Sequence, residues 1–289
     1  MQDASGKALI KELEDPWTSL IIVMIYEYLR QDASPWKPYF DILPPQFDTL
    51  MFWSDDELEN LQASAVRHKI GKSSANEMFH QNVVRPIRSH QALFPHASSL
   101  SDDDILALAH RMGSTIMAYA FDLEKEPSQQ EVDEDGYASD DEDDLLPKGM
   151  VPMADMLNAD ADNNNARLFY GESMVTMKSL KPIKAGEEIF NDYGPLPRAD
   201  LLRRYGYITS NYAQYDVVEI PQQLVIDVFR AKAPQKTPQV AHEKLQSLSC
   251  TEADLADDVV GAKVHIPFPP SSLPNPNTTN PSPPALLPR

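Results

Sequence analysis

The chain has 289 residues, of which 42% are hydrophobic and 24% charged, a composition that fits a globular protein with one large domain or two modest ones. Its formal net charge is -19, and much of it is local, because twelve acidic residues and one lysine lie between Asp122 and Asp144. There is no basic stripe that would neutralise phosphates, so the sequence excludes nucleic acid as an expected direct partner.

The cysteine and histidine content excludes disulfide-stabilised folds and the common metal sites. Cys250 is the single cysteine, so no internal disulfide framework or cysteine-rich zinc cluster is expected, and a reducing compartment is indicated. The seven histidines show no HExxH or paired spacing, so no metal site is expected. The apolar run from Leu20 to Tyr26 is followed by Glu27 and is far shorter than the roughly 20 residues of a membrane span. No signal-peptide pattern is found, and we expect a soluble intracellular protein without membrane contact.

The first half of the chain predicts helices. Asp15 followed by Pro16 predicts a helix N-cap, and the nearly all-apolar stretch from Trp17 to Arg30 predicts a buried helix. The stretch from Ser34 to Pro45 is rich in proline and aromatic residues, which predicts a loop.

Capping signals mark further helices. Ser54 and Glu57 predict a capping box, and Ser101 precedes three aspartates that favour the first turn of another helix. Helices are predicted over 55–69, over 74–91 with a disturbance at Pro86, and from 102 onward with an apolar face ending near Tyr119.

The pattern changes after this helix. The highly charged segment from Glu124 to Lys148 predicts a disordered loop. Ser139 precedes an acidic run that could attract an acid-directed kinase, but we prefer to interpret the segment as a solvated spacer. Alternation around Gly171 predicts a hairpin over 167–180, and 181–190 predicts a turn and another short strand. A short helix should end at Gly206, and nine prolines in the last 24 residues predict an unstructured or polyproline tail.

Three motifs then occur in one order. They are Asp155-Met156-Leu157-Asn158, the segment from Gly186 to Gly194 with Tyr193 near its end, and Leu201 to Tyr207. This order resembles the C-terminal half of a SET domain, the protein-lysine methyltransferase fold. Upstream pieces extend the resemblance to roughly Trp17 to Tyr207. They are similar to the non-histone branch that includes RuBisCO large-subunit methyltransferase, SET domain-containing protein 6 and fungal ribosomal lysine methyltransferase 4.

The resemblance implies an α+β fold, a SET domain with a β-rich, knot-like core and a large helical insert. None of the ten glycines has another glycine two positions away, so the G-x-G element of the family's N-terminal β-segment is missing, and we expect weak S-adenosylmethionine binding unless such a segment is supplied. The C-terminal region is expected to be truncated. The expected organisation is an N-terminal remnant (1–14), the helical insert (15–121), an acidic loop (122–148), the C-terminal half of the SET domain (149–210), the start of a helical substrate-binding domain (211–265) and a proline-rich tail (266–289).

The residues at the motif positions suit methyl transfer to lysine. A tyrosine face attracts a sulfonium or ammonium group, and its hydroxyl orients an amine by hydrogen bonding. The resemblance implies that Tyr193 is catalytic, that Tyr119, Asn158, Ala159 and Tyr205 contact the cofactor, and that Trp36, Asp122 and Asp155 line the substrate side.

Each of these assignments has a structural alternative. Tyr193 and Asn158 are also typical turn residues, and Tyr119 ends an apolar helix face and could simply be core. Trp36 could pack in its loop, and Asp122 could only begin the acidic one. Ala159 stands where the family has histidine, which removes an imidazole but leaves the backbone contacts of that position.

The resemblance therefore predicts a protein-lysine N-methyltransferase that transfers a methyl group from S-adenosylmethionine to a lysine of a protein substrate, either a ribosomal protein or a nuclear factor. It implies nuclear or nucleocytoplasmic residence. The alternatives are a catalytically inactive SET-like peptide-binding module, a truncated gene product, and an acidic adaptor acting through residues 124–148.

Overall fold

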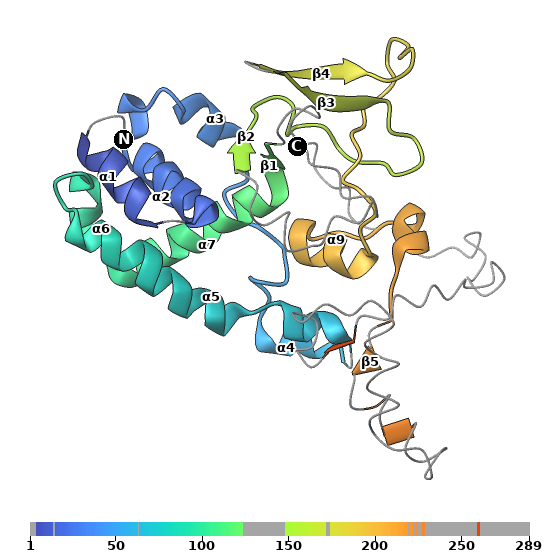
Figure 1. Ribbon diagram of the computed structural model, residues 1–289, viewed down its shortest axis with the longest axis horizontal. Coiled ribbons are helices and arrows are strands. Elements are labelled where there is room, and N and C mark those ends of the chain that lie inside the picture. Colours follow the sequence, from blue (N-terminus) through green and yellow to red (C-terminus); the bar gives the residue numbers. More distant parts are fainter. Residues whose placement is uncertain are drawn as a thin grey trace, which may run out of the picture. The chain divides into compact units, whose positions relative to one another are not determined.

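The structure is a computed structural model that describes residues 4–13, 15–62, 64–123, 148–171, 174–218, 220–221, 224, 227–228 and 259–260. The chain divides into two units, Met1–Asp216 and Val217–Arg289. In the second, β5 (Ile220–Pro221) pairs antiparallel with β6 (Val259–Val260). Ser139, nearly all of the predicted acidic loop and the proline-rich tail lie outside the described residues. The fold described below is that of the first unit (Figure 1).

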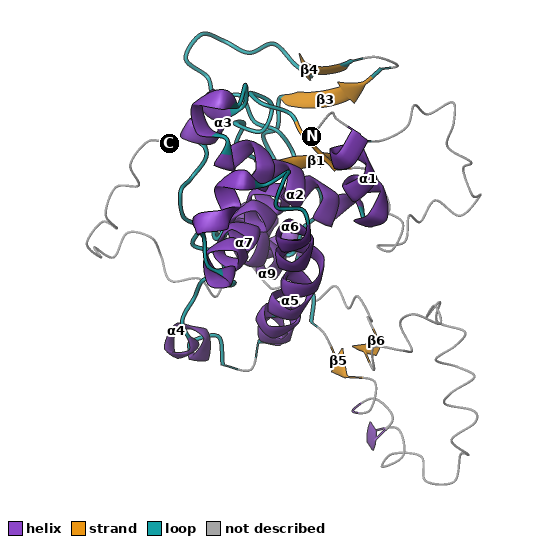
Figure 2. Cartoon of the chain, turned by 90° about the vertical axis from the view of Figure 1, so that its left-hand side faces the viewer, coloured by secondary structure: helices purple, strands orange, loops and turns teal. Residues whose placement is uncertain are grey.

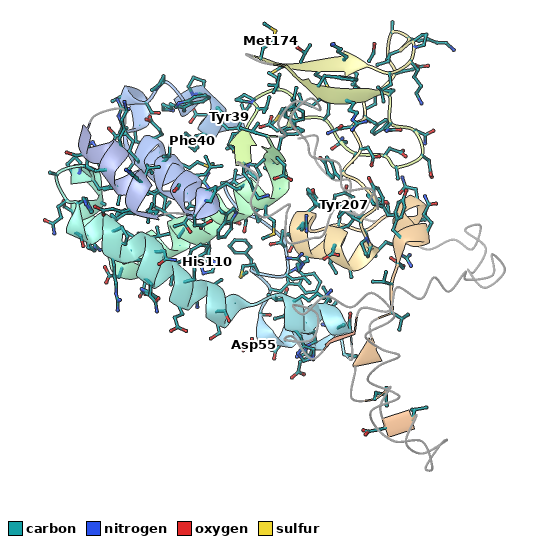
Figure 3. All side chains as sticks on the ribbon, viewed as in Figure 1. Tyr39, Phe40, Asp55, His110, Met174 and Tyr207 are labelled. Carbon is teal, nitrogen blue, oxygen red and sulfur yellow. The ribbon has the colours of Figure 1, made fainter. Side chains whose placement is uncertain are left out.

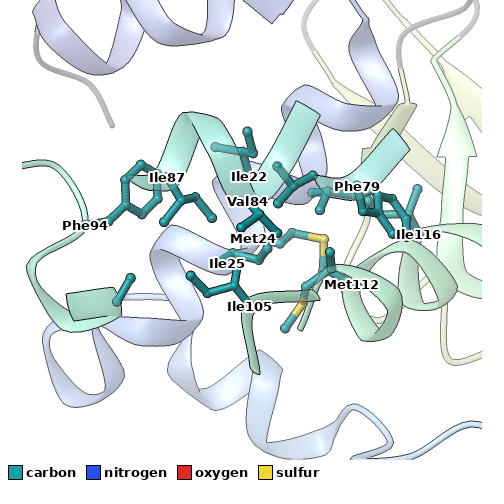
Figure 4. Close-up of a cluster of buried hydrophobic side chains, with 14 of the residues drawn as sticks. Ile22, Met24, Ile25, Phe79, Val84, Ile87, Phe94, Ile105, Met112 and Ile116 are labelled. Atoms are coloured by element: carbon teal, nitrogen blue, oxygen red, sulfur yellow. The ribbon is translucent and has the colours of Figure 1, made fainter. Parts of the chain in front are cut away.

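The core of this unit forms around two helices, α2 (Pro16–Leu29) and α7 (Asp102–Tyr119). The carboxylate of Asp15 accepts hydrogen bonds from the first backbone N–H groups of α2, and Ser101 and Asp104 form a capping box on α7, so both predicted helix starts are confirmed. Together with α1 (Ala4–Leu13), α5 (Lys72–Phe79) and α6 (Arg85–Ser89), they enclose the apolar cluster seen in Figure 4. Its labelled members include Ile22, Ile25, Val84, Ile87, Met112 and Ile116.

The helix predicted over 74–91 is divided. Between α5 and α6, His80–Val84 form a π-helical turn, and Pro86 occupies the first turn of α6. Proline lacks a backbone donor, and its ring crowds the preceding turn of a helix; a wider turn just before it relieves that conflict. The predicted disturbance at Pro86 is confirmed.

Two other predictions for the first half were wrong. The stretch predicted as a loop from Ser34 to Pro45 contains α3 (Lys37–Ile42), because Pro38 falls in the first helical turn, where no backbone donor is required. The helix predicted over 55–69 ends early, as α4 (Asp55–Glu59), and resumes only as a 3-10 turn at Ala65–Lys69. The capping box of Ser54 and Glu57 is confirmed.

Strands are short and few. β1 (Ala120–Asp122) continues from the end of α7 and pairs antiparallel with β2 (Lys148–Met150). β3 (Ala166–Tyr170) and β4 (Val175–Ser179) form the predicted hairpin. The strand predicted within 181–190 is not formed; the neighbouring Asn191 instead makes an isolated parallel bridge with Ala159.

The described part of this unit is thus mixed α+β, which confirms the predicted class, while the β-rich, knot-like core stays a prediction. In Figures 1 and 2 the β1–β2 pair lies between the helical cluster and the β3–β4 hairpin. In the part of the chain that is described, no helix is both long and apolar enough to cross a bilayer, and no three acidic, histidine or cysteine side chains gather as metal ligands.

The last helix of the unit, α9 (Arg198–Tyr205), ends at Gly206 as predicted. Gly206 has φ +78°, and a Cβ atom there would lie 2.7 Å from the backbone oxygen of Asp48. Glycine therefore serves both the left-handed C-cap and a close approach between α9 and the loop before α4.

Replacing Gly206 with alanine should lower the free energy of unfolding by at least about 2 kcal/mol, because the left-handed conformation alone costs about 1 to 2 kcal/mol and the backbone contact adds to it. Gly71→Ala is the matched control, since Gly71 has φ +64° but open space around its Cβ position. Urea denaturation of the three proteins measures the difference. Equal losses in both variants would show that the contact with Asp48 has no energetic weight.

Candidate active site

Two of the three sequence motifs meet through a pair of tyrosines. The rings of Tyr193 and Tyr205 are stacked, with centroids 4.7 Å apart and planes inclined by 21°. Tyr205 is held at the end of α9, and Tyr193 directly precedes Gly194, which turns the chain with φ +86°. The predicted catalytic residue and one predicted cofactor contact are therefore neighbours.

The third motif joins them through the Tyr193 hydroxyl. This hydroxyl donates a hydrogen bond of 3.0 Å to the backbone oxygen of Leu157. The segment after Leu157 and the segment before Tyr193 cross at Asn191. There the N–H of Asn191 donates to the oxygen of Asn158 at 2.8 Å, and the N–H of Asp160 donates to the oxygen of Asn191 at 3.1 Å. A continuous backbone contact thus fixes Tyr193 against the motif that contains Asp155 and Asn158.

Three further tyrosines surround this pair. The Tyr207 ring lies 6.2 Å from that of Tyr205, and Figure 3 shows Tyr207 beside α9. Tyr212 is fully buried, and the charge of Asp192 and the backbone of Tyr193 both affect the pKa of its hydroxyl, so it lies next to this pair. Burial raises the pKa of Tyr193, and the neighbouring hydroxyls of Tyr205, Tyr207, Tyr119 and Tyr212 raise it further. We call these five residues the tyrosine cluster; burial also raises the pKa of Tyr205 and Tyr212, so the phenols of Tyr193, Tyr205 and Tyr212 stay neutral at physiological pH.

Sequence reasoning missed two members of the cluster. Tyr207 ends the Leu201 to Tyr207 motif, so its position offered a signal that was not used. Tyr212 lies in a 3-10 turn, Ser210–Tyr215, that was assigned to the following domain, and no local pattern distinguishes it.

Asn158 and Ala159 differ in what they offer a ligand. The Asn158 side chain is exposed and donates to the Glu188 carboxylate at 2.7 Å. Ala159 sits between the two hydrogen bonds of the crossing with Asn191 and makes none of its own with the described residues. Its predicted contact with the cofactor stays a prediction.

Among the asparagines of this region, Asn165 has a structural role. It is 6% exposed, and its amide donates to the oxygen of Glu188 at 2.8 Å while its side-chain oxygen accepts from the N–H of Phe190 at 2.9 Å. The backbone oxygen of Phe190 accepts from the N–H groups of Asn165 and Ala166. The Asn165 side chain thus hydrogen-bonds the backbone groups of Glu188 and Phe190 that a neighbouring strand would have paired. This explains why the strand predicted within 181–190 does not form.

Asp155 lies in the interior rather than at an open surface. It is 5% exposed, and one carboxylate oxygen accepts a hydrogen bond from the hydroxyl of Tyr39 on α3. Burial raises the pKa of the Asp155 carboxyl, and the hydrogen bond from Tyr39 opposes that shift. Sequence reasoning did not select Tyr39, because nothing local links residues so far apart in the chain.

The other two predicted substrate residues differ in position. Asp122 forms an ion pair of 2.5 Å with Lys148 across the β1–β2 pair, and its charge helps to raise the pKa of Tyr205, so it borders the tyrosine cluster. Trp36 is the N-cap residue of α3 and 47% exposed. No hydrogen bond, ion pair or ring contact among the described residues joins Trp36 to the cluster.

This arrangement defines a class. The family model that matches the chain is the SET domain, over residues 22–194, a range that includes Tyr193 and the crossing at Asn191 but not Tyr205. The chain belongs to the SET-domain family.

Its relatives can be named. Ribosomal lysine N-methyltransferase 4 of Saccharomyces cerevisiae is 35% identical over 219 residues, which are 74% of this chain and 44% of that protein. N-lysine methyltransferase SETD6 of Homo sapiens is 34% identical over 197 residues, 66% of this chain and 38% of the relative. The structure of Rubisco LSMT bound to sinefungin and monomethyllysine is 26% identical with a TM-score of 0.50, covering 71% of this chain and 42% of that one. The chain thus spans less than half the length of each of these relatives.

Replacing Asn165 with alanine should lower the free energy of unfolding by about 1 to 3 kcal/mol, because it removes two hydrogen bonds to partly enclosed backbone. Asn163→Ala is the matched control: Asn163 is exposed and, among the described residues, its side chain hydrogen-bonds to Asp160, so a change within about 0.5 kcal/mol is expected. Denaturant unfolding compares the two. An equal, small effect of both variants would contradict the structural role of Asn165.

The tyrosine cluster also predicts alkaline instability. Burial raises the pKa of Tyr205 to about 12, whereas an unfolded tyrosine titrates near about 10. A group whose pKa is raised on folding contributes stability that is complete below the unfolded pKa and is lost as the pH rises through the folded one. Stability should therefore fall from about pH 10 toward pH 12. Urea midpoints measured across this range should decline less steeply in Tyr205→Phe; the same slope in both proteins would contradict the prediction.

Proposed function

We propose that the chain is the catalytic part of a protein-lysine N-methyltransferase that uses S-adenosylmethionine. The observation that carries the proposal is the junction of Tyr193, Tyr205 and the Leu157 carbonyl, which assembles all three motifs at one place. Membership of the SET family and the two relatives named as lysine methyltransferases support it.

The described residues fit the cofactor. A cluster of neutral tyrosines provides electron-rich ring faces and hydroxyl oxygens that favour a sulfonium cation. The backbone N–H and C=O of Ala159, for which the described residues supply no partner, would add a donor and an acceptor. Tyr119, Asn158 and Tyr205 would hold the remaining parts of the cofactor, with the Asn158 amide shared between it and Glu188.

Bound S-adenosylmethionine would supply a methyl group on a positively charged sulfur. A lysine held in this site would need a free electron pair on its nitrogen to accept that methyl group, and the electrons of the broken S–C bond would stay on sulfur. A partly enclosed apolar setting lowers the pKa of the lysine toward this neutral form. The proton lost from nitrogen passes to water.

Tyr193 would orient the amine. Its hydroxyl proton is committed to the oxygen of Leu157, so the lone pairs of its own oxygen remain free to accept a hydrogen bond from the lysine N–H. Burial keeps the phenol neutral, because it raises the pKa of Tyr193 well above physiological pH. A fixed acceptor that holds the nitrogen in line with the methyl group contributes by orientation rather than by acid or base catalysis.

The substrate we propose is a lysine of a ribosomal protein. The printed name of the yeast relative, ribosomal lysine N-methyltransferase 4, supports this choice. The proposed location of the enzyme is the nucleus, where its substrates would be modified before ribosome assembly.

Tyr193→Phe should abolish most methyl transfer, on the order of a hundredfold or more, because it deletes the only acceptor oxygen that Leu157 fixes. Transfer of labelled methyl groups from S-adenosylmethionine to purified ribosomal proteins measures the rate. The thermal unfolding temperature should change little, since one hydroxyl is removed and packing is conserved.

Tyr26→Phe is the control, because it makes the same change in a half-buried tyrosine of α2 away from the cluster. Its rate should equal that of the wild type. Undiminished methyl transfer by Tyr193→Phe would refute the catalytic assignment of Tyr193. If the wild-type chain bound a lysine peptide without any methyl transfer, a SET-like binding module would be favoured instead.

A further inference from the structure

Tyr39 connects the helical insert to the candidate site. It lies on α3, is 8% exposed, and its hydroxyl donates to a carboxylate oxygen of Asp155, which is 116 positions away in the sequence (Figure 3). Both groups are buried, so the hydrogen bond is made where water cannot replace it. It is therefore a specific tie between α3 and the segment that follows β2.

This segment is a compact turn. The N–H groups of Ala154 and Asp155 both donate to the oxygen of Val151, at 3.1 and 3.2 Å, and the N–H of Leu157 donates to the oxygen of Ala154 at 3.3 Å. Met153, inside the turn, has φ +78° and is 75% exposed. A left-handed conformation costs a residue with a side chain about 1 to 2 kcal/mol, so contacts outside the turn must help to maintain it.

The turn presents the acceptor of the candidate catalytic hydroxyl. Leu157 follows Asp155 by two residues, and its backbone oxygen receives the hydrogen bond of Tyr193. On its C-terminal side the Leu157 carbonyl is anchored by the crossing of Asn158 and Asp160 with Asn191. On its N-terminal side two described ties hold the turn: the pairing of β1 with β2, which ends at Met150, and the bond between Tyr39 and Asp155, which is the tie closer to Leu157.

We propose that Tyr39 is a positioning residue for Tyr193: by holding Asp155, it fixes the turn whose Leu157 carbonyl orients the Tyr193 hydroxyl. This inference rests on the proposed function for its catalytic consequence, although the coupling between Tyr39 and Tyr193 is a property of the fold alone. The hydroxyl of Tyr39 does not touch the reacting atoms in this scheme.

The hydrogen bond between Tyr39 and Asp155 is suited to hold the turn permanently rather than to be made and broken by titration of Tyr39. Burial raises the pKa of Tyr39, and the hydrogen bond to Asp155 and that carboxylate's charge raise it further, with a smaller effect of Tyr119. Tyr39 therefore keeps its proton and remains the donor. The charge-assisted bond to the carboxylate is stronger than a bond between neutral groups, which favours one geometry of the turn.

The kinetic test compares Tyr39→Phe with the wild type and with Tyr26→Phe. We expect kcat to fall on the order of tenfold in Tyr39→Phe, with KM for the protein substrate unchanged, because the hydroxyl that orients the amine is displaced while the binding surface is kept. Adding Tyr39→Phe to Tyr193→Phe should cause no further loss, since the hydroxyl to be positioned is already absent. Additive losses in this double-mutant cycle would overturn the proposal.

A spectroscopic readout does not depend on turnover. With tyrosine labelled at Cζ by an NMR-active carbon isotope, the Tyr193 signal is identified by its loss in Tyr193→Phe. It should shift or broaden in Tyr39→Phe and stay in place in Tyr26→Phe. An unchanged Tyr193 signal in a folded Tyr39→Phe protein would overturn the inference. A shifted signal in a chain without any methyl transfer would support the coupling and refute only the proposed function.

A second pair of variants avoids leaving an unpaired buried charge. Asp155→Asn keeps an acceptor oxygen for Tyr39, so the Tyr193 signal should remain near its wild-type position. Combining Asp155→Asn with Tyr39→Phe cuts the tie without burying a carboxylate, and the signal should then move. The same Tyr193 signal in both proteins would overturn the proposal even if Tyr39→Phe alone failed to fold.

Discussion

Two backbone hydrogen bonds hold residues 158–160 against Asn191, and the candidate site takes its geometry from that crossing. The crossing brings Leu157 within reach of the Tyr193 hydroxyl, and the described residues make no backbone hydrogen bond to Ala159. It is supported from within by Asn165, whose side chain binds the backbone on both sides of Ile189. Backbone contacts of this kind depend on chain path rather than on side-chain identity, which explains how alanine is accommodated at position 159.

Burial is the second physical factor in the site. The tyrosines lie close enough that each hydroxyl disfavours ionisation of its neighbours, and removal from water adds to that effect. The result is a set of neutral phenols with electron-rich faces, an environment that accepts a cation without presenting a nucleophile of its own. Such a surface suits a reaction in which the protein orients two reactants and supplies no proton or covalent bond.

The helical cluster around α2 and α7 provides the rigid support for these contacts. α7 leads directly into β1 and carries Tyr119 at its end, and α9 approaches the loop before α4 closely enough that only glycine fits at position 206. α3 reaches the turn after β2 through Tyr39. Elements that are remote in sequence therefore position the site through a few specific contacts on a tightly packed core.

The sequence by itself determined the local elements whose signals lie within a few residues. The caps of α2, α4 and α7, the hairpin around Gly171 and the end of α9 at Gly206 all follow from short-range hydrogen bonding and backbone conformation. The motif order predicts Tyr193, Asn158 and Tyr205 as site residues, and the structure brings Tyr193 and Tyr205 together. The tertiary structure alone decided the rest. The partnership of Tyr39 with Asp155, the use of Asn165 in place of a strand ladder, and the entry of Tyr212 into the cluster depend on residues brought together from distant parts of the chain. No local periodicity encodes such pairs, because their energy comes from burial and hydrogen bonding that exist only once the core has formed.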